Sequence, residues 1–211
     1  MTTTTELTEK YLSEHPSILD CLKKGIINYS KLSRKIAKDL DIDKKTSMEA
    51  ILIACRRYEI KIKDEKILED KILKILKQSE LEIKNKIIVC IIEKEGYYRK
   101  IIELEKKMRN NAETFYAIEG SKVFTIITSE KHFENLKLLF GKSIIKTSKN
   151  LVMITIKSHR DMEDTPGVIA YLSSLFARSA VNIIEQMSCW IDTIFVISEE
   201  DIPTVMKFLK F

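Results

Sequence analysis

Glycine is scarce in this chain, which has five glycines and three prolines in 211 residues. Phosphate-binding loops need glycine, because glycine alone adopts their backbone conformations at little cost and leaves the amides bare. The tripeptide Gly141-Lys142-Ser143 ends like such a loop, but the glycine required five residues earlier is Leu136. The tripeptide also follows a predicted helix, whereas a phosphate loop precedes one. We therefore predict a helix C-cap at this position.

Cysteine and histidine are few and scattered. The sequence has no C-x-x-C, H-x-x-x-H or G-x-S-x-G pattern among its four cysteines, three histidines and its serines. Structural zinc sites, redox dithiols and serine hydrolases depend on such spacings. The carboxylates of Asp161, Glu163 and Asp164 are interpreted as a solvated loop. We therefore predict no metal, no cofactor and no enzymatic activity, with the cysteines as buried thiols.

Long apolar runs are absent as well, since none approaches the roughly 18 to 20 residues that cross a bilayer. The N-terminus lacks the basic start and apolar core of a secretion signal, so we expect a cytoplasmic protein with no membrane partner. The net charge of +5 is mild and evenly spread along the sequence, which is no electrostatic footprint of nucleic acid. Abundant Lys and Glu with only two glutamines, Gln78 and Gln186, is a thermophile-like bias.

Residues 1–84 have helical periodicity and are predicted to form an all-helical module. Residues 29–58 contain two amphipathic helices joined by a short polar turn, a pattern that resembles a helix-turn-helix, with or without a wing. In that interpretation the residues near DNA are Lys44, Lys45, Ser47, Glu49, Arg56 and Arg57. The alternative is a helical bundle that mediates oligomerisation, because exposed Lys and Arg pairs are common and the turn lacks the usual glycine. The sequence leaves both open.

The pattern changes after residue 84. Residues 85–148 predict the order β-α-β-β-α-β, and residues 149–211 repeat this order but stop before a final strand. Each unit would be a ferredoxin-like split βαββαβ fold with its helices on one face of a sheet, so the fold class is α+β. The second sheet could have three strands, could borrow residues 143–148, or could be completed by a neighbouring chain.

The second repeat contains a specific set of features. A hydrophobic strand ends in a loop, Pro166-Gly167-Val168 opens a helix, and Asn182-Ile183 opens the next strand. An acidic cap at Glu199, Glu200 and Asp201 follows a hairpin. Together they resemble an ACT domain, most closely the regulatory ACT repeats of aspartokinases. The first repeat resembles a divergent ACT unit, with Glu95-Gly96 in place of Pro-Gly, and a helical module before tandem ACT units is similar to archaeal ACT-containing proteins.

The resemblance implies a site for an amino-acid effector between the first loop and helix of one ACT unit and a neighbouring unit. On this sequence that site corresponds to Asp164, Thr165, Pro166, Gly167, Val168, Ile169, Asn182 and Ile183. We expect Pro166 at the first helical position, bare amides at Gly167 that attract a carboxylate, and an asparagine that serves as both donor and acceptor. The alternative is that Pro-Gly only caps the helix.

The predicted function is therefore a non-catalytic regulatory protein that senses a small ligand, with DNA or a partner enzyme as the output. We expect a homodimer through the ACT sheets, because open sheet edges need covering. The alternative is an ACT-mediated dimerisation or regulatory subunit that acts on an enzyme in trans and binds neither ligand nor DNA. An aspartokinase would also need a catalytic domain for which the first 84 residues are too short.

Overall fold

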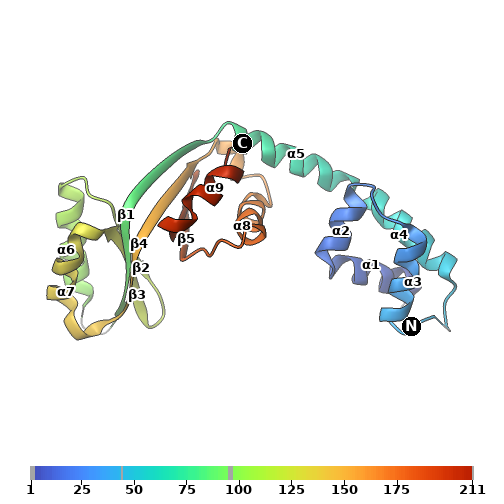
Figure 1. The fold of residues 1–211 in the computed structure, drawn as a ribbon, viewed down its shortest axis with the longest axis horizontal. Coiled ribbons are helices and arrows are strands. Elements are labelled where there is room, and N and C mark those ends of the chain that lie inside the picture. The colour runs from blue at the N-terminus through green and yellow to red at the C-terminus, as the bar shows by residue number, and fades with distance from the viewer. Residues whose placement is uncertain (1–2, 44, 95–96, 211) are drawn as a thin grey trace. The chain divides into compact units, whose positions relative to one another are not determined.

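The computed structural model of the chain describes residues 3–43, 45–94 and 97–210, and for residues 63–68 it describes the backbone alone. The chain divides into two compact units, Met1–Lys71 and Ile72–Phe211. Figure 1 shows the helical first unit in blue and the mixed second unit in green to red. In the described part of the chain, no helix combines the length and the apolar character that a membrane span requires.

The first unit is built from α1 (Thr4–Ser13), α2 (Pro16–Lys23), α3 (Tyr29–Asp39) and α4 (Met48–Lys61). Helix α1 packs against α2 and α4, and α3 packs against α4. Each helix contributes one apolar stripe to a common core, as amphipathic spacing requires. The largest fully buried side chains of this core are Leu12, Leu22, Ile36 and Ile51.

Two tyrosine hydroxyls stabilise this helical core through hydrogen bonds. The Tyr11 hydroxyl donates to the Asp39 carboxylate at 2.5 Å, and the Tyr29 hydroxyl donates to Glu59. Burial, reinforced in each case by the neighbouring carboxylate, raises the pKa of both tyrosines to about 12. The phenols therefore stay protonated donors over the whole physiological range.

Helix α5 (Lys63–Lys77) begins in the first unit and ends in the second. It leads into β1 (Glu80–Glu93), the first strand of the second unit's sheet. After β1 come α6 (Tyr98–Asn110), β2 (Phe115–Glu119), β3 (Val123–Ser129) and α7 (Phe133–Phe140). The chain then continues through β4 (Ile144–Lys157), α8 (Val168–Arg178), β5 (Glu185–Cys189), β6 (Asp192–Ser198) and α9 (Ile202–Phe208).

The six strands form one sheet in the order β2-β3-β1-β4-β6-β5, and all neighbours are antiparallel. The long strands β1 and β4 each serve both halves of this sheet. The second half of β1 pairs with β3, whereas its first half pairs with the end of β4, from Glu80 opposite Lys157 to Lys84 opposite Met153. The two βαββαβ halves therefore interlock and do not simply follow each other.

This strand exchange supplies the strand that the second repeat lacks. Residues 80–84, which precede the first repeat, lie beside β4 and complete the order β1-β4-β6-β5. None of the three sequence explanations is right, because the missing strand comes from earlier in the same chain. The sequence also predicts separate strands at residues 143–148 and 150–158, but these are one continuous strand, β4.

A bend in each long strand makes the exchange possible. Lys86 in β1 and Asn150 in β4 both adopt left-handed backbone, with φ of 54° and 55°. The pairing register shifts beside them, from Lys84 opposite Met153 to Ile87 opposite Leu151. Such bulges bend a strand and increase its twist, so the sheet curls at this point and its two halves face in different directions.

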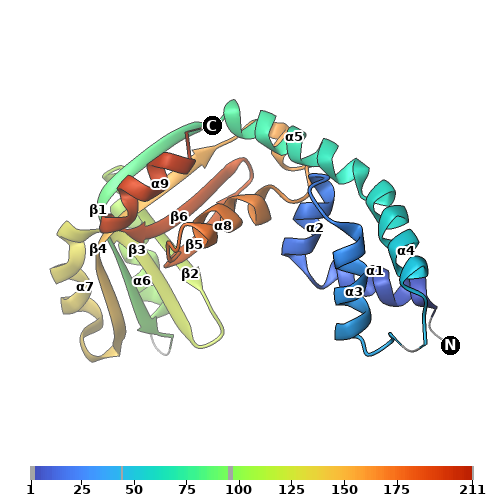
Figure 2. The same ribbon diagram turned by 45° about the vertical axis from the view of Figure 1, so that its right-hand side comes forward.

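The helices cover opposite sides of the curled sheet, α6 and α7 on one side and α8 and α9 on the other (Figures 1 and 2). Ile88, Cys90 and Ile92 of β1 point toward α6 and α7 and form a core with Leu104 and Phe140. In the other half, Phe195 of β6 stacks on Phe176 of α8, with ring centroids 4.6 Å apart.

The helix-free faces of the two halves meet in a third core. Because strand residues alternate between faces, Ile87 and Val89 point away from α6 and α7. They pack with Leu151, Met153 and Val196 from the other half. The second unit is therefore layered as helices, sheet, sheet and helices, and its two sheet halves are held together by apolar burial.

Candidate functional site

The loop that leads from β4 into α8 is closed by its own hydrogen bonds. The Thr165 hydroxyl donates to the Asp161 carbonyl at 2.6 Å, and the Thr165 amide donates to the Met162 carbonyl at 3.3 Å. Met162 is buried, and the Thr193 hydroxyl of β6 points at its sulfur. Buried Thr165 is thus a structural brace of the loop, while Asp164 beside it is exposed.

Gly167 is the N-cap of α8, with φ 89° and ψ −5°. This left-handed conformation strains any residue with a Cβ, so glycine here is required by the backbone. The expectation that Pro166 occupies the first helical position is wrong. The helix begins at Val168, and exposed Pro166 lies one residue before the cap, where its fixed φ sets the approach of the chain.

The first turn of α8 has no side-chain cap, because Gly167 has no side chain to offer. The opening amides of a helix have no intrahelical acceptor and carry the positive end of its dipole. The side chain of Val168 is buried and that of Ile169 half-buried, so they fix the helix start against the sheet. This corner offers peptide N–H donors to a carboxylate.

A rim that the sequence did not reveal borders this corner. Trp190, in the turn between β5 and β6, donates its indole N–H to the Glu163 carboxylate at 3.0 Å. The Arg160 guanidinium lies over the indole ring, 5.4 Å from its centre. The Trp190 side chain is nevertheless 57% exposed and its φ is 54°. A large, exposed aromatic side chain is thus held against the loop that precedes α8.

Asn182 and Ile183 lie at the other end of α8. Strand β5 begins at Glu185, not at Val181 as the sequence predicted, so both residues belong to the loop after α8. The buried Val181 ends the helix, and its amide donates to the Phe176 carbonyl. Eleven helical residues separate Gly167 from this loop, about 16 Å at 1.5 Å per residue. Within one copy the structure does not bring Asn182 to the uncapped amides.

The end of α5 touches the corner from the other side. A Cβ built on Gly167 would lie 3.5 Å from Cδ1 of Ile72. The Ser79 hydroxyl, in the link from α5 to β1, donates to the Ser158 hydroxyl at 2.9 Å. The candidate corner is therefore packed against Ile72, the residue at which the second unit begins.

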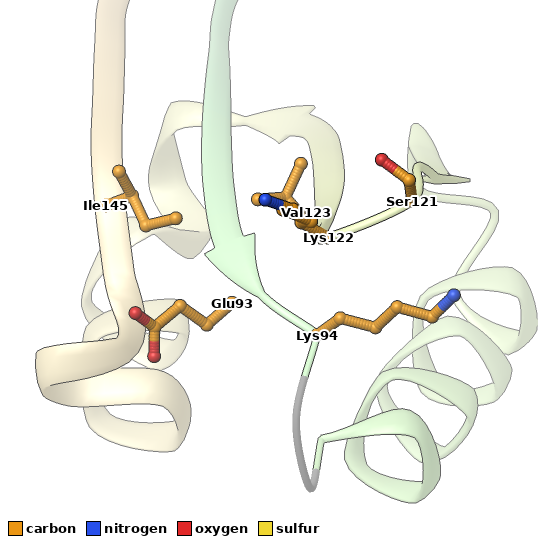
Figure 3. A pocket seen from close by; sticks show the side chains of 6 residues that line it. All are labelled: Glu93, Lys94, Ser121, Lys122, Val123 and Ile145. Carbon is orange, nitrogen blue, oxygen red and sulfur yellow. The ribbon is translucent and has the colours of Figure 1, made fainter.

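A hollow of about 640 Å³ lies at the equivalent corner of the first repeat, where β1 ends. Figure 3 shows its lining: Glu93, Lys94, Ser121, Lys122, Val123 and Ile145. The Lys94 ammonium is already paired with Glu119 at 2.5 Å. The hollow thus has carboxylate, ammonium and hydroxyl groups around an apolar patch. The adjoining pair Glu95-Gly96, predicted to replace Pro-Gly, lies outside the described residues.

The predicted nucleic-acid residues of the first unit have mixed surroundings. Ser47 is the N-cap of α4, and its hydroxyl accepts from the Ala50 amide at 3.2 Å. The Arg56 guanidinium lies 5.5 Å from the centre of the Tyr29 ring, so it packs locally. Lys45, Glu49 and Arg57 are exposed. Lys44 lies outside the described residues.

The predicted helix cap at Gly141 and two of the four predicted buried thiols are found in the structure. Gly141 follows α7 as its C-cap, with φ 49°, and the Ser143 hydroxyl donates to the Tyr97 hydroxyl. Cys55 and Cys90 are buried thiols, and burial raises the pKa of Cys55 to about 11. Cys189 is exposed and Cys21 half-buried, so the prediction of burial is wrong for these two. Among the described side chains, no cluster of three or more His, Cys, Asp or Glu could hold a metal ion.

Comparisons with known proteins find likeness in solved structures only. No protein-family model matches the chain, and no curated protein matches it. Aspartate kinase of Clostridium acetobutylicum, described as an allosteric enzyme, superposes with a TM-score of 0.50 at 18% identity, over 62% of this chain and 33% of the enzyme.

Two further structures are similar. The regulatory subunit of aspartate kinase from Thermus thermophilus gives a TM-score of 0.48 at 11% identity, over 62% of this chain and 92% of the subunit. Aspartate kinase from Synechocystis gives 0.48 at 12% identity, over 61% and 25%. The chain thus spans about a third of the length of the Clostridium enzyme. The interlocked halves of this chain share the ACT-like fold found in aspartate kinases.

Proposed function

We propose that the chain is a non-catalytic regulatory protein whose ACT-like unit senses a small zwitterion, most simply an amino acid. The observation that carries this proposal is the corner at Gly167, where uncapped helix amides follow the loop whose Glu163 holds the exposed Trp190 side chain. The amides suit a carboxylate and Glu163 suits an ammonium, whereas the indole ring, over which Arg160 already lies, suits an apolar side chain. The likeness in fold to an allosteric aspartate kinase supports a regulatory role.

The site is completed by a second copy of the chain in this proposal. Asn182 is exposed and about one helix length from the amides of its own copy, so it is free to serve a neighbour. Strand β5 is an edge of the sheet. Two β5 strands paired antiparallel across a two-fold axis would bring the loop before one β5 to the turn after the other, where Trp190 and the corner lie.

The contact of α5 with the corner gives the sensor a connection to the helical unit. A ligand that displaces Gly167 or its loop changes the packing of Ile72, which belongs to the helix that begins in the first unit. The output of the helical unit would then be contact with DNA or with an enzyme. A ligand shifts such an equilibrium only by the difference in its affinity for the two arrangements.

A second candidate function is dimerisation without a ligand, with regulation of an enzyme in trans. The open edges β2 and β5 favour it, because unpaired strand edges are ready to pair with another chain. In this case the corner at Gly167 is only a helix cap.

A thermal-shift screen of the full chain against the twenty amino acids separates the two functions. A ligand at 100 times its Kd adds about 2.7 kcal/mol to the free energy of unfolding, and Trp190, the only tryptophan, reports binding by its fluorescence. Absence of any shift or fluorescence change would leave dimerisation as the function.

The variant Asn182→Ala tests whether the ligand binds at the site that includes Asn182. We expect it to abolish the ligand shift while the protein keeps its unfolding midpoint, because Asn182 is exposed. Asn135→Ala, at an exposed position on α7, is the matched control and should keep the full shift. If Asn182→Ala keeps the shift and Glu93→Gln loses it, the ligand binds in the hollow at the end of β1 instead.

A further inference from the structure

The charged residues of helix α3 lie on one face and its apolar residues on the other. The mild net charge of the whole chain does not suggest this arrangement. Its inner face is buried in the first unit's core: Leu32, Ser33, Ile36 and Ala37. Its outer face is exposed and carries only cations at positions i, i+3, i+4 and i+7: Lys31, Arg34, Lys35 and Lys38. Residues at this spacing lie on one side of a helix. The charge of the chain is modest, but here it is sorted onto one surface.

The other basic helices do not offer such a surface. The outer side of α4 carries Glu49 as well as Arg57, and the apolar side chains of Ile53 (43%) and Ile60 (65%) are also exposed on this helix. On α6 the cations alternate with acids, and Arg109 is bound to Glu105 at 2.7 Å. Of the helices α3, α4 and α6, α3 is thus the one whose exposed face is cationic over two turns.

The cations of α3 remain largely available. Arg34 uses its Nε–H to bond the Ser30 carbonyl, a bond that engages one of five guanidinium donors and holds the arginine along the helix. Lys35 pairs with Asp39 at 2.9 Å, but Asp39 also accepts the Tyr11 hydroxyl and lies past the end of the cationic row. The lysine of this pair is still 59% exposed.

The connection before α3 fixes its orientation. Helix α2 ends at Gly25, whose φ of 66° closes a helix-ending turn in which the Ile26 amide donates to the Cys21 carbonyl. Asn28 caps α3 by accepting from the Lys31 amide at 3.0 Å. Two helices joined by a short turn that contains glycine suit a helix-turn-helix with α3 as its second helix. The sequence predicts the motif at residues 29–58, where α3 would be its first helix.

We propose that the outer face of α3, the surface formed by Lys31, Arg34, Lys35 and Lys38, binds the phosphate backbone of double-stranded nucleic acid. A helix with its side chains is about 10–12 Å wide, which fits the roughly 12 Å major groove of B-DNA. The row of four cations suits the phosphate groups, whose contacts dominate the affinity of proteins for DNA. Ser30 and Arg34 lie near the start of the helix, the part of a recognition helix that contacts bases.

The proposal specifies the output of the proposed function, and it can fail while ligand sensing stands. An apolar groove of about 400 Å³ beside α3 includes Ile18, Ile27 and Leu32, with Lys31 and Lys35 also in its lining. The exposed Ile26 (69%) also lines it. Such a groove would suit an acidic peptide, so the test must separate nucleic acid from an acidic protein.

The test measures fluorescence anisotropy of a labelled 30-base-pair DNA duplex with the full chain, at several salt concentrations. Four phosphate contacts predict that log K falls with log [salt] with a slope of about −3.6. We expect the variant K31Q/R34Q/K35Q/K38Q to bind at least tenfold more weakly at low salt, with a slope near zero. The matched variant K45Q/R56Q/R57Q on α4 should bind like the unmodified chain.

Three outcomes overturn the proposal. They are no binding at 50 mM salt, equal binding by the α3 variant, and poly-L-glutamate binding as tight as that of the duplex, which would assign the face to an acidic protein. If the quadruple variant does not fold, Arg34→Gln and Lys38→Gln alone should each flatten the slope by about one. The thermal-shift response to amino acids is unaffected by any of these variants, so failure here leaves the sensing proposal intact.

Discussion

Left-handed backbone at residues other than glycine marks equivalent points of the two repeats. Ala112 follows α6 and Ala180 follows α8, with φ of 53° and 54°. In both cases the next residue's amide donates to a carbonyl five residues back: Glu113 to Met108 and Val181 to Phe176. This is the helix-ending arrangement that usually has glycine. This glycine-poor chain has alanine at these positions, where the left-handed backbone strains the Cβ.

The first prediction follows from this cost. Replacing Ala180 with glycine should raise the free energy of unfolding by about 0.5–1 kcal/mol, because the left-handed strain of a Cβ exceeds the added entropy of the unfolded chain. Urea denaturation measures the change. The matched control Ala177→Gly, inside α8, should lower stability by about 1 kcal/mol. A destabilised Ala180→Gly would mean that the alanine methyl contributes packing that outweighs its strain.

Residue-scale signals in the sequence were reliable where they act locally. The cap at Gly141 lies where the sequence predicted it. Gly25, Ser47 and Gly120 likewise occupy a helix end, an N-cap and a hairpin, which are positions that these residue types favour. The corner at Gly167 was found for the same reason, because Pro-Gly before an amphipathic stretch is a local signal. Its rim was not found, since Trp190 is 27 positions from Glu163 and meets it only once a β-hairpin has folded.

At the scale of elements, the sequence predicted the order of helices and strands but not how the strands pair. The first half of β1 was missed although Glu80, Glu82 and Lys84 alternate with Leu81 and Ile83, because it is short and follows a helix without a turn signal. Its partner in the sheet is the far end of β4, more than 60 residues away. Periodicity within a window carries no information about such a partner.

The second prediction tests this shared strand. A chain that begins at Ile72 should fold its sheet, because Ile72–Phe211 forms a compact unit. A chain that begins at Lys86 should not, because the end of β4 loses its partner from Met153 to Lys157 and buried Ile154 and Ile156 become exposed. Hydrogen exchange of the β4 amides measures the difference. Equal protection of Ile154 in both chains would show that residues 80–84 are dispensable for the sheet.

At the scale of the whole second unit, the curled sheet places charges of one half against the other. Glu185 of β5 lies half-buried near Lys146 of the first half of β4. Burial raises the pKa of the Glu185 carboxyl, and the Lys146 ammonium only partly opposes this. At the outer edge, hydrogen bonds from Lys157 and then Lys84 hold the pKa of Glu82 below its usual range. The pKa of Glu185 is therefore raised and that of Glu82 lowered, so pH changes their contributions to the stability of the fold in opposite directions.

The last prediction uses this pair. Because the pKa of Glu185 is raised on folding, its contribution to stability is present below about pH 4.5 and is lost as pH rises through the raised value. Glu185→Gln should therefore be more stable than the unmodified chain at pH 7.5, and the two should converge near pH 4.

The pKa of Glu82 is lowered, so its contribution is present above pH 4.5 and is lost as pH falls. Glu82→Gln should cost about 0.2–1 kcal/mol at pH 7.5, the range for exposed ion pairs, and progressively less in acid. Urea denaturation at the two pH values measures both variants, with each as the control for the other. If Glu185→Gln is destabilised at pH 7.5, the attraction of Lys146 outweighs burial, and the two sheet halves are held together there by an ion pair.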